Sequence, residues 1–445
     1  ICVIAESEEL IANIYKKFNE MLDQKSSNKD SDDSKVELSS ITDTLNEYDD
    51  ANLMLFSIPG PFVKREAKIA LNAGKNIMIF SDNVTIDEEK ELKELAYSKG
   101  LIVMGPDCGT AIINGKGLAF ANAMPIGTFG IIGASGTGIQ QVSVILANNG
   151  YGVKHAIGLG GRDLSEKIGG LGMLTALDAL EEDADIEVVI LISKPPHQTV
   201  ETKIFERLKN YKKKVVVCFL KGNEAECKKR GLPFAATLED CAKLAICVLN
   251  NQEFKGCGYD VPETELKKYI ELIKKQAKNK YIRGLYSGGT LCDEALYLFT
   301  KAGFEIYSNI PLDPKLKLKD SYKSYKHTLV DLGEDEFTKG RPHPMIDYTL
   351  RCQRMEEEAA DKDTGILLID IVTGYGSHIN PLEPLVDSIQ KINQKNSEIV
   401  IVASICGTEW DPQNIKELSK KLKELNVIIM PTNAQAARLI IDALK

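Results

Sequence analysis

Several common signatures of function are missing from this chain of 445 residues. Its ten cysteines form no Cys-x-x-Cys pair, its five histidines form no His-Glu-x-x-His spacing, and no P-loop is present. The longest apolar runs, 215–220 and 366–372, have the length of strands and are far too short to span a membrane. We therefore expect no metal site and no membrane segment, and the scattered thiols indicate a reducing cytoplasm.

An excess of positive charge is missing as well. The chain has 55 basic and 64 acidic residues, which give a net charge of −9 and an isoelectric point near 5.4. This balance argues against nonspecific binding to nucleic acid or to a membrane surface. The chain begins at Ile1 without an initiator methionine, so we expect its N-terminus to be incomplete.

What the sequence does contain is a regular alternation of apolar strands and helical segments. The first unit is predicted to contain a strand at 1–5, a helix at 8–22, a polar loop at 23–40, strands at 52–58, 76–80 and 101–104, and helices at 61–73 and 87–99. A similar alternation starts again at 130 and at 281. We predict an α/β protein of three consecutive doubly wound, Rossmann/flavodoxin-like domains with parallel sheets, at residues 1–127, 128–255 and 256–445.

The strongest candidate for a binding site is the turn that opens the second unit. A buried strand, the turn GASGTG at 133–138 and an apolar helix follow one another. Unpaired N–H groups at a helix start, together with the helix dipole, favour an anion. We predict that Ser135, Gly136, Thr137 and Gly138 bind phosphate. The alternative is a turn that requires glycine for its geometry alone.

Several motifs resemble those of a known family. SIPGPF at 57–62, GPDCG at 105–109, GASGTG at 133–138 and GLGGRD at 158–163 resemble, in order and spacing, the α subunit of succinyl-CoA synthetase. The third unit, with DIVTGYG at 370–376, is similar to the C-terminal domain of the synthetase β subunit. More narrowly, strings such as SDNVTIDEE, HAIGLGGRDLS and KGRPHPMID resemble the FdrA family over nearly the whole chain. In synthetases two glycine turns face each other across a phosphate, which implies a phosphate-binding role for Gly374, Gly376 and Ser377.

The chain also departs from the synthetases at three places. The segment 221–237, where the phosphorylated histidine is expected, contains no histidine, and no nucleotide-binding ATP-grasp domain is present. The first turn, residues 5–9, reads AESEE, and its glutamates would repel the diphosphate of CoA. We therefore expect no cofactor.

A second set of candidate residues lies outside the glycine turns. We predict that His343 and Arg341, held in a rigid Arg-Pro-His-Pro segment, are catalytic, with Arg341 able to grip a carboxylate through two hydrogen bonds. Arg162, Lys194 and Asp331 are predicted to bind substrate. The alternatives are a surface turn for the first pair, an Arg–Asp structural pair for Arg162 and a solvated Lys194. We read His155 as a core histidine and Cys108 as a packing residue rather than a nucleophile.

The resemblance implies a function in which small anions are the ligands. FdrA-family proteins are associated with allantoin and purine degradation, as one subunit of an oxamate carbamoyltransferase that interconverts oxamate plus carbamoyl phosphate with oxalurate plus phosphate. The implied partners are carbamoyl phosphate or another acyl phosphate, a carboxylate acceptor, other subunits of a hetero-oligomer and further copies of this chain. Two alternatives stay open: an acyl-CoA ligase subunit that uses CoA and ATP with a separate ATP-grasp chain, and a non-catalytic anion-binding scaffold.

Overall fold

The computed structural model describes residues 40–277 and 280–445, which belong to two compact units, Ile1–Asp49 and Asp50–Lys445. In the first unit the described part is helix α2 (Ile41–Glu47), where the Ser40 hydroxyl accepts a hydrogen bond from the amide of Asp43. The strand, helix and loop predicted at 1–5, 8–22 and 23–39, and the acidic turn at 5–9, lie outside the described residues.

The first sheet of the second unit is small and parallel, with strand order β1-β2-β3. Its elements are β1 (Leu53–Phe56), β2 (Asn76–Ile79), β3 (Val103–Met104), α3 (Gly60–Asn72) and α4 (Ile86–Ser98). Helix α4 begins with a capping box in which Thr85 and Glu88 each bond to the backbone of the other. The predicted strands and helices of this region are confirmed.

The second sheet has the strand order β5-β4-β7-β6-β8-β9. Its strands are β4 (Thr110–Ile113), β5 (Lys116–Ala119), β6 (Phe129–Gly133), β7 (Val153–Gly158), β8 (Val188–Ser193) and β9 (Lys214–Phe219). Its helices are α5 (Gly136–Asn148), α6 (Leu171–Glu182), α7 (Gln198–Leu208), α8 (Glu224–Lys229) and α9 (Leu238–Leu249). The antiparallel β4–β5 hairpin was not predicted, and it joins this sheet although it lies in the segment assigned to the first domain.

The third sheet is fully parallel, with strand order β11-β12-β10-β13-β14-β15. Its strands are β10 (Tyr281–Tyr286), β11 (Tyr307–Ser308), β12 (Thr328–Asp331), β13 (Thr364–Val372), β14 (Val400–Cys406) and β15 (Ile428–Met430). Its helices are α10 (Glu263–Gln276), α11 (Gly289–Lys301), α12 (Asp335–Thr338), α13 (Thr349–Ala360), α14 (Leu382–Lys395), α15 (Ile415–Glu424) and α16 (Asn433–Leu444), with a 3-10 turn at Pro314–Leu316.

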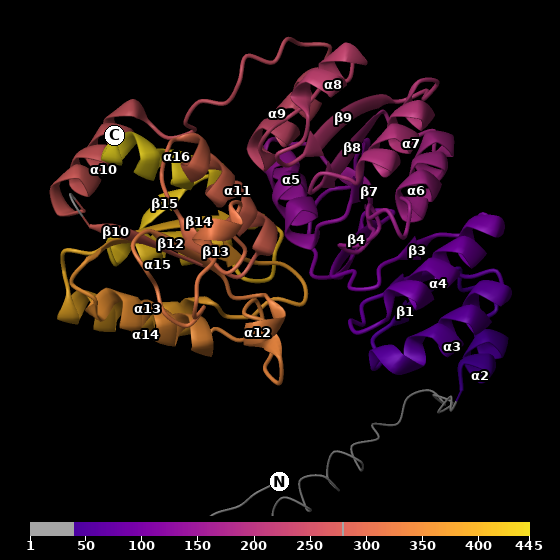
Figure 1. Cartoon of the computed structure of the whole chain (residues 1–445), viewed down its shortest axis with the longest axis horizontal. Helices are drawn as coiled ribbons and strands as arrows, with labels where there is room; N and C mark the ends of the chain where they lie inside the picture. The colour runs from indigo at the N-terminus through magenta and orange to yellow at the C-terminus, as the bar shows by residue number, and fades with distance from the viewer. Residues whose placement is uncertain (1–39, 278–279) are drawn as a thin grey trace, which may run out of the picture. The chain divides into compact units, whose positions relative to one another are not determined.

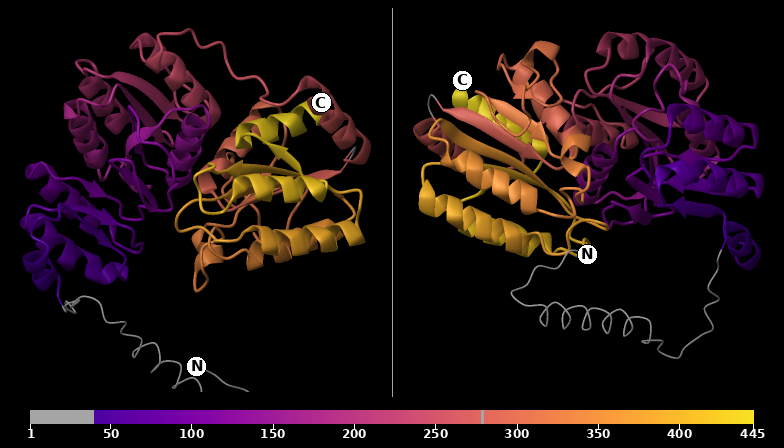
Figure 2. Two further views of the ribbon diagram at one scale, coloured as in Figure 1. Left: turned by 180° about the vertical axis from the view of Figure 1, so that it is seen from behind. Right: turned by 60° about the horizontal axis from the view of Figure 1, so that its bottom comes forward.

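Helices cover both faces of the larger sheets, which explains why their central strands are apolar throughout. All nine residues of β13 are buried, and so are those of β6 and β8. Figures 1 and 2 show α13 and α14 side by side on one face of the third sheet, while α11 and α16 pack together on the other. The predicted fold class, α/β with three mostly parallel sheets, is therefore confirmed. The domain boundaries themselves stay a prediction.

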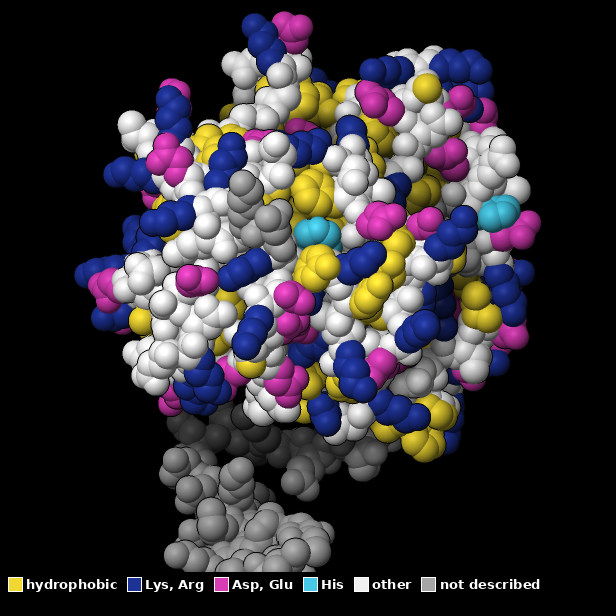
Figure 3. Space-filling view, turned by 60° about the vertical axis from the view of Figure 1, so that its left-hand side comes forward, with side chains coloured by type: hydrophobic (Ala, Val, Ile, Leu, Met, Phe, Trp, Pro, Cys, Tyr) yellow, Lys and Arg dark blue, Asp and Glu magenta, His cyan; other side chains and the backbone are white. Residues whose placement is uncertain are grey.

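The surface agrees with the mixed composition. On the face drawn in Figure 3, basic and acidic side chains are interspersed among polar and apolar ones. Among the described helices, none combines the length and the apolarity that crossing a membrane requires.

The topology marks two positions where ligands commonly bind. In the second sheet β6 lies between β7 and β8, and in the third sheet β10 lies between β12 and β13, so the chain crosses to the opposite side of each of these strands. The carboxyl end of such a strand opens into a crevice, because the flanking connections lie on opposite faces of the sheet. The turns that follow β6 and β10 are residues 135–138 and 287–290, called the α5 turn and the α11 turn below.

Candidate functional site

A cleft of about 770 Å³ lies at the carboxyl ends of strands from all three sheets. Residues that follow β1, β2 and β3 form one wall, the α5 turn and Lys194 form a second, and the α11 turn with the segment 331–346 forms a third. The cleft is therefore built where the topology predicts a ligand.

The two turns touch inside this cleft. The hydroxyls of Ser135 and Thr290 are 2.5 Å apart, and the amide of Thr290 donates a 3.4 Å hydrogen bond to Oγ1 of Thr137. Helices α5 and α11 pack against each other, and one buried apolar cluster runs through both. The N-terminal ends of both helix dipoles consequently meet at one place.

The two turns differ in the N–H groups that they leave free. In the α5 turn, Ser135 Oγ accepts from the amide of Gly138 at 2.9 Å, and the amides of Gly136 and Thr137 make no hydrogen bond within the described residues. In the α11 turn, the carboxylate of Asp370 accepts from the amides of Ser287 and Gly288, both at 2.7 Å. An internal carboxylate thus occupies two amides of the α11 turn, where only that of Gly289 has no partner among the described residues. The α5 turn, with two such amides, offers the better anion site.

Asp370 is held in turn by a fully buried arginine. Nη1 of Arg351 lies 3.1 Å from the Asp370 carboxylate and 2.6 Å from the Asp370 carbonyl oxygen. Nε and Nη2 of Arg351 have no hydrogen-bond partner in the described part of the chain, and the guanidinium lies over the ring of Tyr348. Arg351 thus holds the carboxylate that accepts from the amides of the α11 turn, and the pair stabilises the conformation of this turn.

Three residues predicted to bind phosphate lie elsewhere. Gly374, Gly376 and Ser377 do not line the cleft, and the backbone around them packs on the segment 119–122, where the amide of Tyr375 donates to the carbonyl of Ala121 at 2.7 Å. Gly374 has φ of 105°, and a Cβ there would collide with that carbonyl. Glycine is required here by the close approach of two chain segments. The turn that faces Ser135 is the α11 turn.

Lys194 lies at the carboxyl end of β8 beside the α5 turn, as predicted. Its ammonium group forms a 2.8 Å ion pair with Asp293 of α11, which also pairs with Lys221 at 3.1 Å. Burial alone would lower the pKa of Lys194, but Asp293 outweighs this effect and raises it. The side chain is 62% exposed, so the cation is fixed in position and remains accessible from the cleft.

His343 and Arg341 both line the cleft. The guanidinium of Arg341 is exposed and makes no hydrogen bond or ion pair with a described residue. Nδ1 of His343 accepts from the amide of Met345 at 3.2 Å, which leaves the ring proton on Nε2. Burial, together with Arg351, lowers the pKa of His343 to about 4, so the ring is neutral at physiological pH. A neutral imidazole with Nε2–H acts as a hydrogen-bond donor rather than as a base.

Asp331 ends β12 and lies between the α11 turn and the loop that follows the strand. Its Oδ1 accepts from the amide of Gly333 at 2.8 Å, and a Cβ on Gly289 would collide with Oδ2. Burial, with Glu334 and Asp370, raises the pKa of Asp331 to about 7 against the opposing effects of the Gly333 amide and Lys194.

Arg162 is not in the cleft lining. Its Nε pairs with Glu89 at 2.9 Å and its Nη2 donates to the carbonyl of Val84 at 2.8 Å. The adjacent Asp163 pairs with the buried Lys93 of α4 at 2.8 Å. Arg162 therefore takes part in an ionic contact between α4 and the segment that follows β7. No contact in the described residues supports its predicted role as a substrate clamp.

Sequence reasoning missed how acidic the cleft is. Five acidic residues line it against the two basic residues Lys194 and Arg341: Asp82, Asp107, Asp331, Glu334 and Asp335. Burial, followed by the nearby Asp82 and Asp335, raises the pKa of Asp107 to about 6. Asp107 and Asp331 each end or follow a predicted strand, and this position was the available signal. In the described residues no group of acidic, histidine or cysteine side chains has the arrangement of a metal site.

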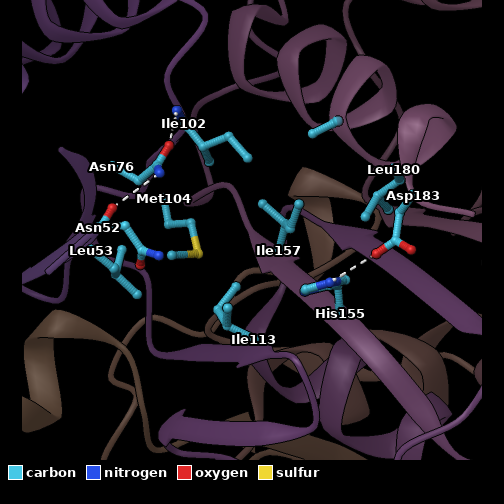
Figure 4. Close-up of a pocket in the computed structure, with 11 residues that line it drawn as sticks. Asn52, Leu53, Asn76, Ile102, Met104, Ile113, His155, Ile157, Leu180 and Asp183 are labelled. Atoms are coloured by element: carbon cyan, nitrogen blue, oxygen red, sulfur yellow. Dashed lines mark hydrogen bonds and ion pairs between the residues drawn. The ribbon is translucent and has the colours of Figure 1, made fainter. Parts of the chain in front are cut away.

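A second, smaller cavity of about 150 Å³ lies between the first and second sheets (Figure 4). Its walls are largely apolar, and the side chains of Asn76, His155 and Asp183 bond to protein groups. His155 pairs with Asp183 at 3.2 Å and accepts from the amide of Asn114, while Asn76 bonds to the backbone at Asn52 and Ile102. His155 is thus a satisfied structural histidine. Cys108, nearby in the same core, is buried, which raises its pKa to about 12.

Comparisons with known proteins agree with this architecture. The family model described as CoA binding domain matches residues 126–222, and the one described as CoA-ligase matches residues 285–441. The uncharacterized protein YahF of Escherichia coli (strain K12) is 40% identical over 439 residues, which are 98% of this chain and 84% of YahF.

Weaker similarity extends to subunits of CoA ligases. The succinate–CoA ligase (ADP-forming) subunit alpha of Methanothermobacter thermautotrophicus is 26% identical over 160 residues, 35% of this chain and 53% of that subunit. The ADP-forming sulfoacetate-CoA ligase subunit SauD of Bilophila wadsworthia is 27% identical over 190 residues, 40% of this chain and 62% of SauD. The match therefore spans less than two thirds of either ligase subunit.

Proposed function

This chain belongs to the family of Escherichia coli YahF, a family with CoA-ligase-type domains, and from this premise we propose that it is the FdrA-type subunit of a carbamoyl- or acyl-phosphate transferase. The finer proposal is oxamate carbamoyltransferase, in which oxamate and carbamoyl phosphate give oxalurate and phosphate. The relatives that are named as subunits of CoA ligases support a role as one subunit of a hetero-oligomer, and we expect the chain to associate with further copies of itself as well.

The observation that carries this proposal is the pair of free amides in the α5 turn, next to the cation of Lys194. The amides of Gly136 and Thr137 and the positive end of the α5 dipole suit the phosphoryl oxygens of an acyl phosphate. These donors are fixed before the ligand arrives, so they can stabilise the charge that develops on the leaving phosphate without reorganisation.

His343 and Arg341 supply the remaining functions. The Nε2–H of His343 is suited to polarising the carbonyl oxygen of the acyl group, because a neutral imidazole donates without adding a charge to an acidic cleft. The free guanidinium of Arg341 is suited to holding the carboxylate of the acceptor through two parallel hydrogen bonds. Neither role requires CoA or a nucleotide.

A second candidate function is an acyl-CoA ligase subunit that works with a separate nucleotide-binding chain. It is favoured by the two family models. A non-catalytic scaffold that binds anions is a third possibility, which activity of the assembled complex would exclude.

Calorimetric titration of the full chain with phosphate, carbamoyl phosphate, CoA and ATP distinguishes the first two candidates. We expect phosphate and carbamoyl phosphate to bind and CoA not to bind. Binding of CoA at micromolar concentrations, or stable labelling of His343 by radioactive ATP, would contradict the transferase proposal.

The α5 turn is tested by Gly136→Val. The Cβ of the new valine would lie 3.1 Å from Oγ1 of Thr110. We expect its methyl groups to fill the space in front of the free amides. We expect phosphate affinity to fall at least 30-fold with little change in the melting temperature. Gly161→Val is the matched control, because a Cβ at Gly161 meets nothing within 4 Å and its affinity should equal that of the wild type.

A further inference from the structure

One carboxylate of the cleft has an oxygen without a partner. Asp331 is only 4% exposed, and its Oδ1 accepts from the amide of Gly333, whereas Oδ2 makes no hydrogen bond or ion pair with any residue in 40–277 or 280–445. A buried carboxylate normally satisfies both oxygens, since an unpaired polar atom costs free energy. Because Asp331 lines the cleft, Oδ2 is available to a ligand there.

This oxygen lies beside the place where the two turns meet. It is so close to Gly289 of the α11 turn that any Cβ at Gly289 would collide with it. The next residue, Thr290, contacts both Ser135 and Thr137 of the α5 turn. A ligand whose phosphate occupies the free amides of the α5 turn is thus brought next to Oδ2.

The groups around Asp331 come from several elements. Glu334 follows it on the loop, Asp335 begins α12, and Asp370 comes from β13. Asp293 of α11 pairs with Lys194, which follows β8, and the neutral His343 lies across Gly333. Burial and this surplus of negative charge together raise the pKa of Asp331 to about 7. A group that titrates near neutral pH is effective in both accepting and returning a proton.

His343 is unsuited to the same task. Its Nδ1 lone pair is occupied by the amide of Met345, and its Nε2 already bears the proton. Arg341 and Lys194 remain charged and have no lone pair to offer. Asp107, whose pKa is also raised, lies on the wall that follows β3, whereas Oδ2 of Asp331 lies against Gly289 where the two turns meet. Asp331 is therefore the carboxylate of this cleft that combines a free acceptor atom with a position at the two turns.

Building on the proposed function, we propose that Asp331 is the catalytic proton acceptor of the transfer. The acceptor's amide nitrogen attacks the acyl carbon, a C–N bond forms, and the bond from that carbon to the phosphate oxygen breaks with its electron pair leaving on phosphate. Oδ2 of Asp331 takes the proton that the nitrogen loses and passes it to the departing phosphate oxygen. Charge and atoms balance without a further reactant.

The binding arm of the test uses sulfate, which does not titrate between pH 6 and 8. A dianion beside Asp331 favours its protonated form, so the full-length wild type should take up a fraction of a proton per bound sulfate at pH 7.5. Calorimetry in two buffers of different ionisation enthalpy measures this uptake. Asp331→Asn keeps the size of the side chain and its oxygen for Gly333, and it should bind sulfate with a much smaller uptake, because Asp107, whose pKa is about 6, is then the remaining carboxylate with a raised pKa in the lining. Asp387→Asn, at an exposed carboxylate of α14 outside the cleft lining, should retain the wild-type uptake.

The kinetic arm uses the chain assembled with its partner subunits. We expect Asp331→Asn to lower kcat at least 100-fold, to change KM for carbamoyl phosphate less than about threefold and to remove the pH dependence of kcat near pH 7. Proton uptake by Asp331→Asn equal to that of the wild type would overturn the role of Asp331 alone. Failure of the wild type to bind either sulfate or carbamoyl phosphate would overturn the proposed function itself. If Asp331→Asn did not fold, absence of uptake in the wild type would still refute the assignment.

Discussion

His343 shows how one backbone contact decides the chemistry of a side chain. The amide of Met345 occupies Nδ1, and burial lowers the pKa of the ring from 6.5 to about 4. Between these two pH values the folded protein therefore keeps His343 neutral, whereas the unfolded chain binds a proton there. As the pH falls from 6.5 to 4, the unfolded state gains a proton that the folded state does not, and the free energy of unfolding decreases by up to about 3 kcal/mol.

We predict that His343→Gln removes this part of the acid sensitivity. At pH 8 the ring is neutral in both states, so any difference in melting temperature between His343→Gln and the wild type reflects packing alone. Between pH 6.5 and 5 the melting temperature of the wild type should fall more steeply than that of the variant. Parallel curves over this range would show that the ring is protonated in the folded state.

The candidate side chains whose positions could be predicted from the sequence are those at a strand end, while their substrate-binding roles stay predictions. Lys194 and Asp331 come directly after or at the end of β8 and β12, and parallel strands bring their carboxyl ends to one edge of a sheet. The ion pair of Arg162 could not be predicted, because its partner, Glu89, lies on a helix of another sheet, 73 positions earlier in the chain. No local pattern reports such a contact.

At the scale of elements, the α11 turn depends on an ion pair buried behind it. Arg351 and Asp370 are both inaccessible to solvent, and Asp370 accepts from the amides of Ser287 and Gly288. Removing one member leaves the other as an uncompensated buried charge. We predict that Asp370→Asn lowers the free energy of unfolding by about 3 kcal/mol.

The double variant Asp370→Asn/Arg351→Met separates this electrostatic cost from a loss of packing. With both charges gone, the destabilisation should be smaller than the sum of the single variants by on the order of 1 kcal/mol or more. Denaturant unfolding measures all three. Glu356→Gln serves as the control: it lies on α13, as Arg351 does, and breaks a surface pair with Lys391 of α14, so it should change stability by less than about 0.5 kcal/mol. Additive single effects would contradict the coupling.

The elements also show where prediction from sequence ends. The β4–β5 hairpin turns at Asn114-Gly115, both with positive φ, and Asn-Gly is a strong hairpin signal that was available and not used. Gly374 is the opposite case, since its positive φ serves the close passage of the segment 119–122 rather than an anion. A glycine in a turn predicts an unusual backbone, and the ligand has to be inferred from which N–H groups remain unpaired.

For the whole molecule, the cleft predicts that one small anion connects all three sheets of the unit Asp50–Lys445. Its walls come from the ends of β1 and β2, from the α5 turn, and from the α11 turn with the segment 331–346. A ligand that binds only the folded state stabilises it by RT ln(1 + [L]/Kd), about 2.7 kcal/mol at a hundredfold excess over Kd. Saturating phosphate should therefore slow hydrogen exchange in all three walls together. The strands around the small cavity, such as β7 at His155, should exchange as before, because their polar groups are already paired. Protection confined to the loops of one sheet would show that the anion binds to a single turn, and the three-walled site proposed here would then be wrong.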